Sequence, residues 1–332
     1  MGNTILQIEN LVKHFRSNWT FRRMEAVKDI SLEVYRGESF GFLGPNGAGK
    51  TTTIKCIMGL VRKTSGRIFF DGTPLVSPAQ HEQIGYLPEL PYFYEHLSVA
   101  ETLDLFAALH GIRGKERARR VDEALERVGL AQRKKSAVRA LSKGLQQRLG
   151  FAQAILNRPA MLFLDEPFSG LDPMGRREMR ELILDLKAQG TTIFLSSHIL
   201  SDVEKICDRV SIMALGKLKA TFYLKDIPTL FGERYELVAS STDRSDTASA
   251  QRVRDSAIHS SSRDGSDGPV LSFEFESYDS GLRAMHDLIE YGYKIREFQS
   301  MALPLEEIFV KLTSGETSAA VAPRAFDPEV RV

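Results

Sequence analysis

The fold is decided by the stretch Ser39-Phe40-Gly41-Phe42-Leu43-Gly44-Pro45-Asn46-Gly47-Ala48-Gly49-Lys50-Thr51. Its first five residues are apolar enough to form a buried strand, and the rest fits the pattern G-x-x-x-x-G-K-[ST]. Beyond it, Ile54, Ile57 and Met58 lie at i, i+3 and i+4 and Gly59 is a stop signal, so the sequence predicts a helix. Strand, glycine-rich loop and helix in this order are the context that a P-loop requires.

The residues of this loop suit a nucleoside triphosphate. Glycines let successive backbone N–H groups turn inward, and the start of the helix adds the positive end of its dipole. We expect Lys50 to reach the β- and γ-phosphates and Thr51 to hold Mg²⁺ through its hydroxyl. The other nucleotide-binding candidates here are Gly44, Pro45, Asn46, Gly47, Ala48, Gly49 and Thr52. The alternative, a turn with a merely solvated lysine, is disfavoured by the two flanks.

Two adjacent acids follow a second apolar strand. The run Met161-Leu162-Phe163-Leu164 leads directly into Asp165 and Glu166. A strand of this kind would bring the Asp165 carboxylate to the Mg²⁺ held by Thr51. Glu166 would then point at the γ-phosphate and act as general base toward an attacking water. The alternative is an acidic strand end that only caps a loop.

The composition limits the class of protein. The 332 residues suggest about two domains, and 42% hydrophobic with 26% charged residues is typical of a soluble globular chain. A net charge of +1 gives no overall attraction to nucleic acid or to an anionic membrane. The two cysteines, Cys56 and Cys207, exclude a disulfide framework and agree with a reducing compartment. No signal sequence and no run of eighteen apolar residues occurs, so we expect no membrane crossing by this chain itself.

The order of the patterns predicts an α/β fold in two domains. Residues 1–219 alternate strand and helix signals, which indicates a mostly parallel sheet core with an antiparallel β part and a helical subdomain inserted at about 90–158. Residues 220–312 read as a small α+β domain. It is interrupted at 240–268 by a Ser- and Asp-rich stretch that we expect to be disordered, as we do the tail 313–332.

Aromatic side chains lie between the first two predicted strands. Phe15, Trp19 and Phe21 occur there among Lys, Arg and Ser residues. They are either exposed residues of a hairpin or a platform on which an adenine ring stacks, with Phe15 as the first candidate.

Taken in order, the motifs resemble those of the ATP-binding subunit of ABC transporters, in particular of bacterial exporters. The resemblance covers Leu6 to Lys219 and implies a P-loop NTPase of the ABC cassette type. Besides the P-loop and the acidic pair, it rests on four elements: Leu141-Ser142-Lys143-Gly144-Leu145-Gln146-Gln147-Arg148, similar to the LSGGQ signature; Ser169-Gly170-Leu171-Asp172, similar to the D-loop; His198, at the place of the switch histidine; and Glu89, at the place of the Q-loop glutamine.

The resemblance implies a site shared by two copies of the chain in a head-to-tail dimer. ATP and Mg²⁺ would lie between the P-loop of one copy and Ser142 and Gly144 of the other, where a capped helix start is an anion site. Asp172 would join the nucleotide contacts and His198 would bind the γ-phosphate as a second catalytic residue.

Glu89 would join Thr51 and Asp165 at the metal. Three residues depart from the family pattern: Lys143 stands in place of Gly, and Leu145 and Glu89 stand in place of Gln. These departures put in question the strength of the γ-phosphate contact and the metal dependence.

We therefore expect an ATPase subunit that powers a separate transmembrane permease, for export, at the cytoplasmic face of the cell membrane. The resemblance implies that the permease docks near Glu89 and the segment from Tyr92 to Phe106. The alternative is a soluble ABC ATPase acting on nucleic acid or ribosomes. Such relatives carry two cassettes or a long coiled coil between the P-loop and the acidic pair, and this sequence has neither, so we expect no nucleic-acid partner.

A third alternative is a regulatory module without turnover, which Glu166 disfavours. The small C-terminal domain follows every ATP-site motif. It is therefore either a regulator or dimer brace, or a simple stabilising appendage.

Overall fold

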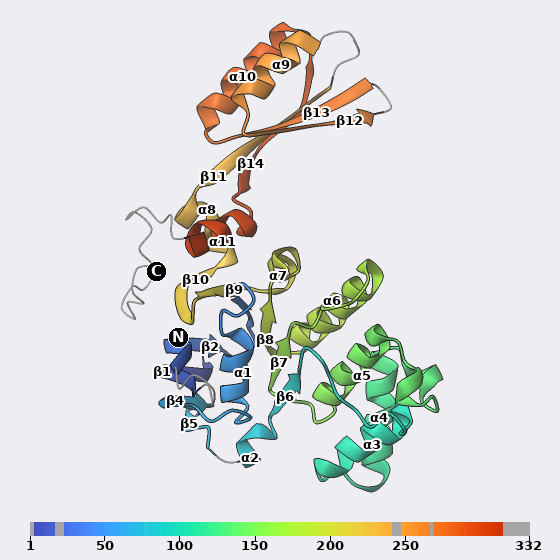
Figure 1. The fold of residues 1–332 in the computed structure, drawn as a ribbon. Coiled ribbons are helices and arrows are strands. Elements are labelled where there is room, and N and C mark those ends of the chain that lie inside the picture. The colour runs from blue at the N-terminus through green and yellow to red at the C-terminus, as the bar shows by residue number, and fades with distance from the viewer. Residues whose placement is uncertain (1–2, 17–22, 77, 241–246, 266–267, 315–332) are drawn as a thin grey trace. The chain divides into compact units, whose positions relative to one another are not determined.

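The computed structural model describes residues 3–16, 23–76, 78–240, 247–265 and 268–314 (Figure 1). The chain divides into two compact units. Unit 1 comprises the described residues up to Leu224 and from Phe309 onward, and unit 2 comprises those between Lys225 and Ile308. The border that we expected at Lys219 falls later, because strand β10 (Lys217–Tyr223) still belongs to the central sheet of unit 1.

A six-stranded sheet forms the centre of unit 1. Its order is β10-β9-β3-β8-β7-β6, parallel throughout except for β10 at the edge. Its other strands are β3 (Ser39–Leu43), β6 (Ile84–Leu87), β7 (Met161–Asp165), β8 (Thr192–Ser197) and β9 (Arg209–Ala214). Strands β3, β7, β8 and β9 are buried at every position, as in a parallel sheet with both faces covered.

An antiparallel sheet of order β2-β1-β4-β5 lies in the same unit. Its strands are β1 (Thr4–Arg16), β2 (Arg23–Tyr35), β4 (Ser65–Phe70) and β5 (Thr73–Pro74). Helix α1 (Lys50–Ile57) belongs to a core shared with both sheets, since Ile54 packs in one cluster with Ile8 of β1 and Phe42 of β3. The short helix α2 (Pro78–His81) follows β5. Trp19 and Phe21 lie outside the described residues.

A helical block interrupts the α/β order, as the sequence predicts. It consists of α3 (Val99–Leu109), α4 (Gly114–Arg127), two short 3-10 turns (Ala131–Arg133 and Val138–Ala140) and α5 (Lys143–Ile155). Ser98 and Glu101 form the predicted capping box of α3. The remaining helices of the cassette, α6 (Pro173–Ala188) and α7 (Leu200–Ile206), stand beside the central sheet (Figure 1).

Unit 2 is a split β-α-β arrangement with its own core. After a 3-10 turn (Leu224–Asp226) and α8 (Ile227–Phe231) come β11 (Glu233–Ser240), α9 (Thr247–Ser256), β12 (His259–Gly265), β13 (Gly268–Phe275), α10 (Tyr278–Glu290) and β14 (Lys294–Ala302). The antiparallel sheet order β12-β13-β11-β14 is that of the ferredoxin-like fold. Helices α9 and α10 lie together on the sheet (Figure 1) and enclose a core that includes Leu237, Phe273 and Leu288.

The prediction of disorder over 240–268 was wrong for the part of that stretch that the structure describes; residues 241–246 and 266–267 lie outside the described residues. Helix α9 buries Val253 in the core of unit 2, and β12 pairs along the whole of β13 from His259 to Gly265. Backbone pairing does not depend on apolar side chains, so a Ser-rich edge strand forms where its partner strand is already fixed. Helix α11 (Leu305–Ser314) reaches into the start of the predicted tail, and the rest of that tail lies outside the described residues.

Candidate active site

Three neighbouring strands end at the same edge of the central sheet. The register places Leu43 at the end of β3 opposite Ser197 of β8, and Asp165 at the end of β7 opposite Ser196. The segments that follow these strands are the P-loop, the acidic pair and the switch histidine. They converge because the carboxyl ends of adjacent parallel strands meet at one edge.

Two glycines of the P-loop are required by close backbone approaches. A Cβ on Gly44 would lie 2.4 Å from the carbonyl oxygen of Met213, and one on Gly49, at φ 110°, would lie 2.4 Å from that of Ala26. Any other residue would push the loop away from β2 and β9. Ala48 is buried, and the exposed rim of the loop consists of Pro45, Asn46 and Gly47.

Lys50, the first residue of α1, folds back over the loop. Its Nζ donates a hydrogen bond to the carbonyl oxygen of Gly44 at 2.7 Å and lies 3.3 Å from Glu166 Oε1. The lysine side chain is buried, so its ammonium acts in a medium of low dielectric constant. Thr52, half-buried, continues the first turn of the same helix. A cation at this helix start suits the phosphate-binding role expected of the loop.

Thr51 and Asp165 form the candidate magnesium site. Thr51 Oγ1 donates to Asp165 Oδ1 at 3.1 Å, and Ser196 Oγ donates to the same oxygen at 2.6 Å. Burial raises the pKa of the Asp165 carboxyl, and the hydrogen bonds from Ser196 and Thr51 offset only part of this effect. A nearby bound cation would relieve the cost of ionising this buried carboxylate.

The donor set fits magnesium that is held jointly with phosphate. Mg²⁺ takes oxygen ligands, commonly one or two carboxylates together with substrate phosphates. Across the described ranges, no group of three or more His, Cys, Asp or Glu side chains is arranged to hold a metal ion by itself. Thr51 and Asp165 would thus supply the protein ligands, and the phosphates and water would supply the rest.

Glu166 is held by two partners through its two oxygens. While Oε1 faces Lys50, Oε2 lies 2.8 Å from His198 Nδ1 and accepts from the His198 backbone N–H at 3.3 Å. The Glu166 backbone has φ 50°, a left-handed conformation that costs a non-glycine residue about 1–2 kcal/mol. Its N–H donates to the carbonyl oxygen of Ser196 at 3.0 Å. Strained backbone of this kind clusters at active sites.

Ser142 and Asp172 stand at the starts of two helices. Ser142 Oγ accepts from Leu145 N at 3.4 Å at the start of α5, and Asp172 Oδ1 accepts from Gly175 N at 2.7 Å at the start of α6. In the described part of the chain, neither Ser142 nor Asp172 is hydrogen-bonded to the P-loop. The nucleotide contacts expected of these two residues and of Gly144 stay predictions that require a second copy.

Glu89 and Phe15 are not joined to this cluster. Glu89 is exposed beyond the end of β6, and among the described residues it has no hydrogen bond to Thr51 or Asp165. Phe15 is half-buried near the end of β1, with Lys13 Nζ 4.6 Å from its ring centroid. The metal role of Glu89 and the adenine role of Phe15 stay predictions.

Ser196 was not among the residues predicted for the site. This residue is fully buried and binds Asp165 through its hydroxyl and Glu166 through its carbonyl oxygen. A polar residue near the end of an otherwise apolar strand, two positions before His198, was the available signal.

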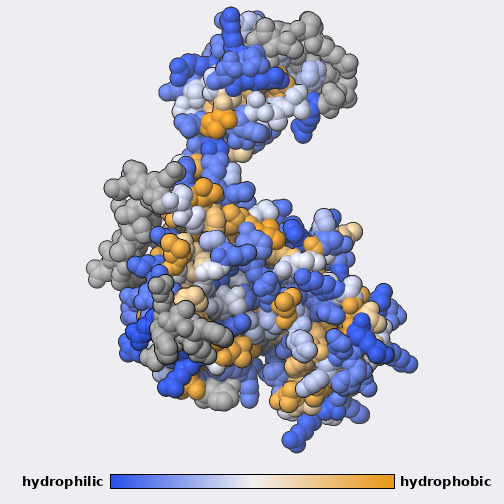
Figure 2. All heavy atoms as spheres, viewed as in Figure 1, coloured by the Kyte–Doolittle hydropathy of each residue, from blue (hydrophilic) through white to orange (hydrophobic). Residues whose placement is uncertain are grey.

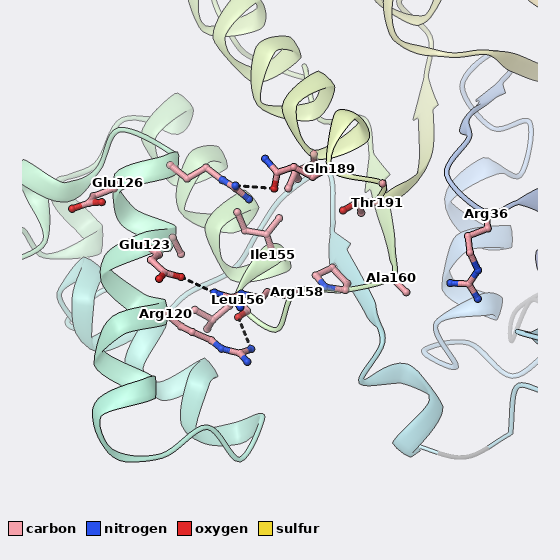
Figure 3. Close-up of a pocket in the computed structure, with 15 residues that line it drawn as sticks. Arg36, Arg120, Glu123, Glu126, Ile155, Leu156, Arg158, Ala160, Gln189 and Thr191 are labelled. Atoms are coloured by element: carbon pink, nitrogen blue, oxygen red, sulfur yellow. Dashed lines mark hydrogen bonds and ion pairs between the residues drawn. The ribbon is translucent and has the colours of Figure 1, made fainter.

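A cavity of about 810 Å³ lies away from this cluster, at the amino ends of β7 and β8 (Figure 3). Four arginines line it, and Figure 3 shows Arg158 pointing at Glu123. Each is paired with an acidic side chain: Arg36 with Asp71, Arg120 with Glu116, Arg127 with Asp185 and Arg158 with Glu123. Because their charges are already engaged, this cavity does not offer a phosphate site comparable to the P-loop.

Comparison with known proteins agrees with the geometry of the P-loop cluster. The family model described as ABC transporter matches residues 27–169. The bacitracin transport ATP-binding protein BcrA of Bacillus licheniformis is 35% identical over 320 residues, which cover 95% of this chain and 99% of that protein. This chain belongs to the ABC transporter family.

Two further comparisons match about two thirds of this ABC ATP-binding protein. An uncharacterized ABC transporter ATP-binding protein of Synechocystis is 46% identical over 226 residues, 67% of this chain and 64% of that relative. The solved structure of cbiO1 from Clostridium perfringens, part of the ABC transporter complex cbiONQ, superposes with a TM-score of 0.60 at 31% identity, covering 69% of this chain and 92% of that one. The predicted P-loop NTPase fold of the ABC cassette type is confirmed.

Membership of the family also shows the general activity of the cassette. The protein is an ABC transporter ATP-binding subunit, and its cassette is of the kind that binds nucleotide and hydrolyses ATP. None of the helices in the described ranges has the length and apolar character needed to span a membrane.

Proposed function

We propose that this ABC protein hydrolyses ATP to power a separate transmembrane permease, for export. The observation that carries the proposal is the position of Glu166, whose two carboxylate oxygens contact Lys50 and His198 beside the bonded pair Thr51 and Asp165. A carboxylate within reach of both a phosphate-binding lysine and a histidine is placed to act on water at the γ-phosphate.

Each of these residues has a distinct task in the proposed reaction. Lys50 and the start of α1 hold the phosphates, and Thr51 with Asp165 binds the metal. Bound Mg²⁺ would neutralise phosphate charge. Glu166 takes the proton of the attacking water, and His198 orients the Glu166 carboxylate through the 2.8 Å contact and binds the γ-phosphate.

The proposal includes a second copy of the chain. Ser142 and Gly144 lie at the start of α5, where backbone N–H groups favour anions, and Asp172 caps the start of α6 with its own carboxylate. Within the described ranges they are not hydrogen-bonded to their own P-loop, so a head-to-tail homodimer would give them a nucleotide to contact. ATP would then lie between the two copies and hold them together.

An exposed patch after β6 supports a permease partner. We call Leu90, Tyr92 and Tyr94 the docking patch; their exposed fractions are 67%, 94% and 63%. Phe93 between them is buried and meets Phe106 of α3 edge-on at 6.2 Å, which anchors the segment to the helical block. Figure 2 shows further apolar side chains exposed over this block among hydrophilic ones. Large exposed aromatic and aliphatic side chains favour a protein partner.

Docking to a permease would place the protein at the cytoplasmic face of the membrane. BcrA, whose name states bacitracin transport, is similar along nearly the whole chain and supports a role in transport.

A nucleic-acid or ribosomal role is the less favoured alternative. In unit 2, the face of the sheet opposite Phe273 and Leu237 carries Ser272, Glu236 and Glu274. RNA-binding sheets of similar topology present aromatic side chains for base stacking at such positions. Carboxylates there would instead repel a phosphate backbone.

Co-purification tests the proposal. The full-length chain, tagged and expressed in its own host, should be recovered from detergent-solubilised membranes together with a polytopic membrane protein, and the complex should hydrolyse Mg·ATP. Recovery with ribosomes or nucleic acid, and without a membrane protein, would establish the alternative.

A further inference from the structure

The first turns of α5 are joined to the loop that follows Glu166. Gln147 Nε2 donates to the carbonyl oxygen of Pro167 at 3.4 Å. A Cβ on Gly144 would lie 3.4 Å from Leu171 Cδ2, in ordinary van der Waals contact. The start of α5, which is expected to contact the γ-phosphate held by a second copy, is therefore packed on the loop that follows Glu166. Glu166 is the proposed base for the nucleotide held by its own chain.

A third contact lies at the outer end of this junction. The side chain of Lys143 runs over Gly170, so that a Cβ there would come within 2.5 Å of Lys143 Nζ. Gly170 has φ 69°, a conformation that glycine adopts without strain. Both residues are exposed, so water competes with this contact more than with the buried one.

Gln147 differs from these neighbours because it is a buried polar side chain, with an exposed fraction of 2%. Burying an amide is costly unless it is hydrogen-bonded, so the bond to Pro167 fixes the relative position of α5 and the loop. From the other side, Ser196 holds the backbone N–H of Glu166. Glu166 is thus hydrogen-bonded to β8 through its own N–H, and the next residue, Pro167, is hydrogen-bonded to α5 through its carbonyl oxygen.

We propose that Gln147 is a positioning residue for Glu166: its amide fixes Pro167, the residue after the base, and so links the start of α5 to the catalytic carboxylate of the same chain. This inference rests on the proposed function, which assigns the base. The Gln147–Pro167 contact would connect the two nucleotide sites through one chain. At one end is the signature, where the nucleotide of a second copy would bind; at the other is Glu166, which acts on the chain's own nucleotide.

Gln147→Met tests the amide while preserving length and approximate volume. We expect kcat for ATP hydrolysis to fall about tenfold, the rate equivalent of one neutral hydrogen bond, with the affinity for ATP unchanged. Gln153→Met is the matched control, since Gln153 is a half-buried glutamine near the other end of α5. It should leave both quantities at the wild-type values.

Gln147→Glu adds a pH-dependent readout. A protonated carboxyl can donate an O–H to the Pro167 carbonyl oxygen as the amide does, whereas the ionised carboxylate cannot. Burial favours the protonated form. The activity of the variant relative to wild type should therefore rise as the pH falls, while Gln147→Met shows a constant ratio.

A measurement independent of turnover separates this inference from the proposed function. Because His198 Nδ1 contacts Glu166, the NMR cross peak of the His198 ring, assigned with His198→Gln, reports on the position of Glu166. We expect this peak to move in Gln147→Met and not in Gln153→Met. If the wild-type chain has no ATPase activity, the proposed function is wrong. The shift of the His198 peak would then test the role of Gln147 by itself. An unmoved peak, or unchanged kcat in an active enzyme, would overturn the role of Gln147.

Discussion

The Thr51 hydroxyl donates a hydrogen bond to Asp165 Oδ1 at 3.1 Å, which joins residues 114 positions apart in the sequence. The bond connects the first turn of α1 to the end of β7. It brings two of the three predicted metal ligands into direct contact, while the third, Glu89, is not bonded to either of them in the described part of the chain. Since Ser196 donates to the same oxygen, the carboxylate is fixed by the protein before any cation is added.

The raised pKa of Asp165 gives a stability prediction. Burial lifts this pKa above its ordinary value near 3.8, so the folded chain binds the proton more tightly than the unfolded chain. The free energy of unfolding therefore falls as the pH rises from the unfolded pKa through the folded one. Without nucleotide or metal at neutral pH, Asp165→Asn should melt at a higher temperature than wild type, as measured by differential scanning calorimetry. A lower melting temperature would contradict the sign of this effect.

Replacement of the base should separate binding from hydrolysis. In Glu166→Gln, ATP binding should persist because Lys50 and the loop remain, while turnover should fall by about 10²- to 10⁴-fold. Phosphate release and equilibrium nucleotide binding measure the two quantities. Glu181→Gln, an exposed glutamate of α6 paired with Arg177, is the control and should behave as wild type. Near-normal turnover in Glu166→Gln would remove this residue from the role of base.

ATP should drive association of two copies. If Ser142 and Gly144 contact a nucleotide held by another P-loop, the Glu166→Gln protein should sediment as a dimer with Mg·ATP and as a monomer with Mg·ADP. The γ-phosphate is the group that differs between the two nucleotides. Equal sedimentation under both conditions would count against the shared site.

The docking patch should affect coupling without affecting chemistry. Tyr92→Glu places a charge on the most exposed aromatic of the patch, so the permease-stimulated part of ATP turnover should be lost while basal turnover stays at the wild-type level. Val76→Glu, at another apolar residue that is 79% exposed, should retain stimulation. Full stimulation of the Tyr92 variant would locate the permease elsewhere.

Removal of unit 2 should leave nucleotide binding intact. A cut at Lys219 would sever β10, whose Phe222 is buried and pairs with Val210, so the cut must fall after Leu224. Truncation there removes unit 2 together with the end of α11, residues 309–314, which belong to unit 1. We expect the truncated chain to keep its ATP affinity and to lose dimer stability or permease coupling. Titration with a fluorescent ATP analogue and stimulated turnover measure these two properties. Lower ATP affinity in a folded truncation would assign unit 2 to the nucleotide site, and unchanged coupling would make it an appendage.

Most of the cassette fold was predictable because its elements carry local signals. The buried strands β3 and β7 are apolar runs. The helix caps Ser98 and Asp172 have side chains that accept hydrogen bonds from the first helical turn. Gly44 and Gly49 of the P-loop lie where a side chain would clash with neighbouring backbone. Strand β12 was not predictable in this way. Its Ser-rich sequence has no apolar pattern, and it forms through backbone pairing to β13.

The sequence predicts which residues belong to the site, but it does not predict which of them contact each other. The motifs name Lys50, Asp165 and Glu166, but nothing in their spacing shows that one carboxylate faces the lysine and the histidine at once. The register of β7 and β8 decides this, and it also recruits Ser196, which belongs to no motif. The sequence gives no sign that Gln147 differs from the other residues of the signature stretch, because its burial is known only from the folded chain.

The pairing of β11 with β14 has a consequence for how this chain is assembled. Glu233, at the start of β11, faces Ala302, at the end of β14, so the backbone enters and leaves the ferredoxin-like sheet within about 5 Å. The two ends of this segment are therefore close together. If the segment were removed, a short connection could join the flanking chain, and the entropy cost of closing such a connection grows only slowly with its length. Domains with adjacent ends can be acquired, exchanged or deleted by a single genetic insertion or excision, without rerouting the polypeptide around them.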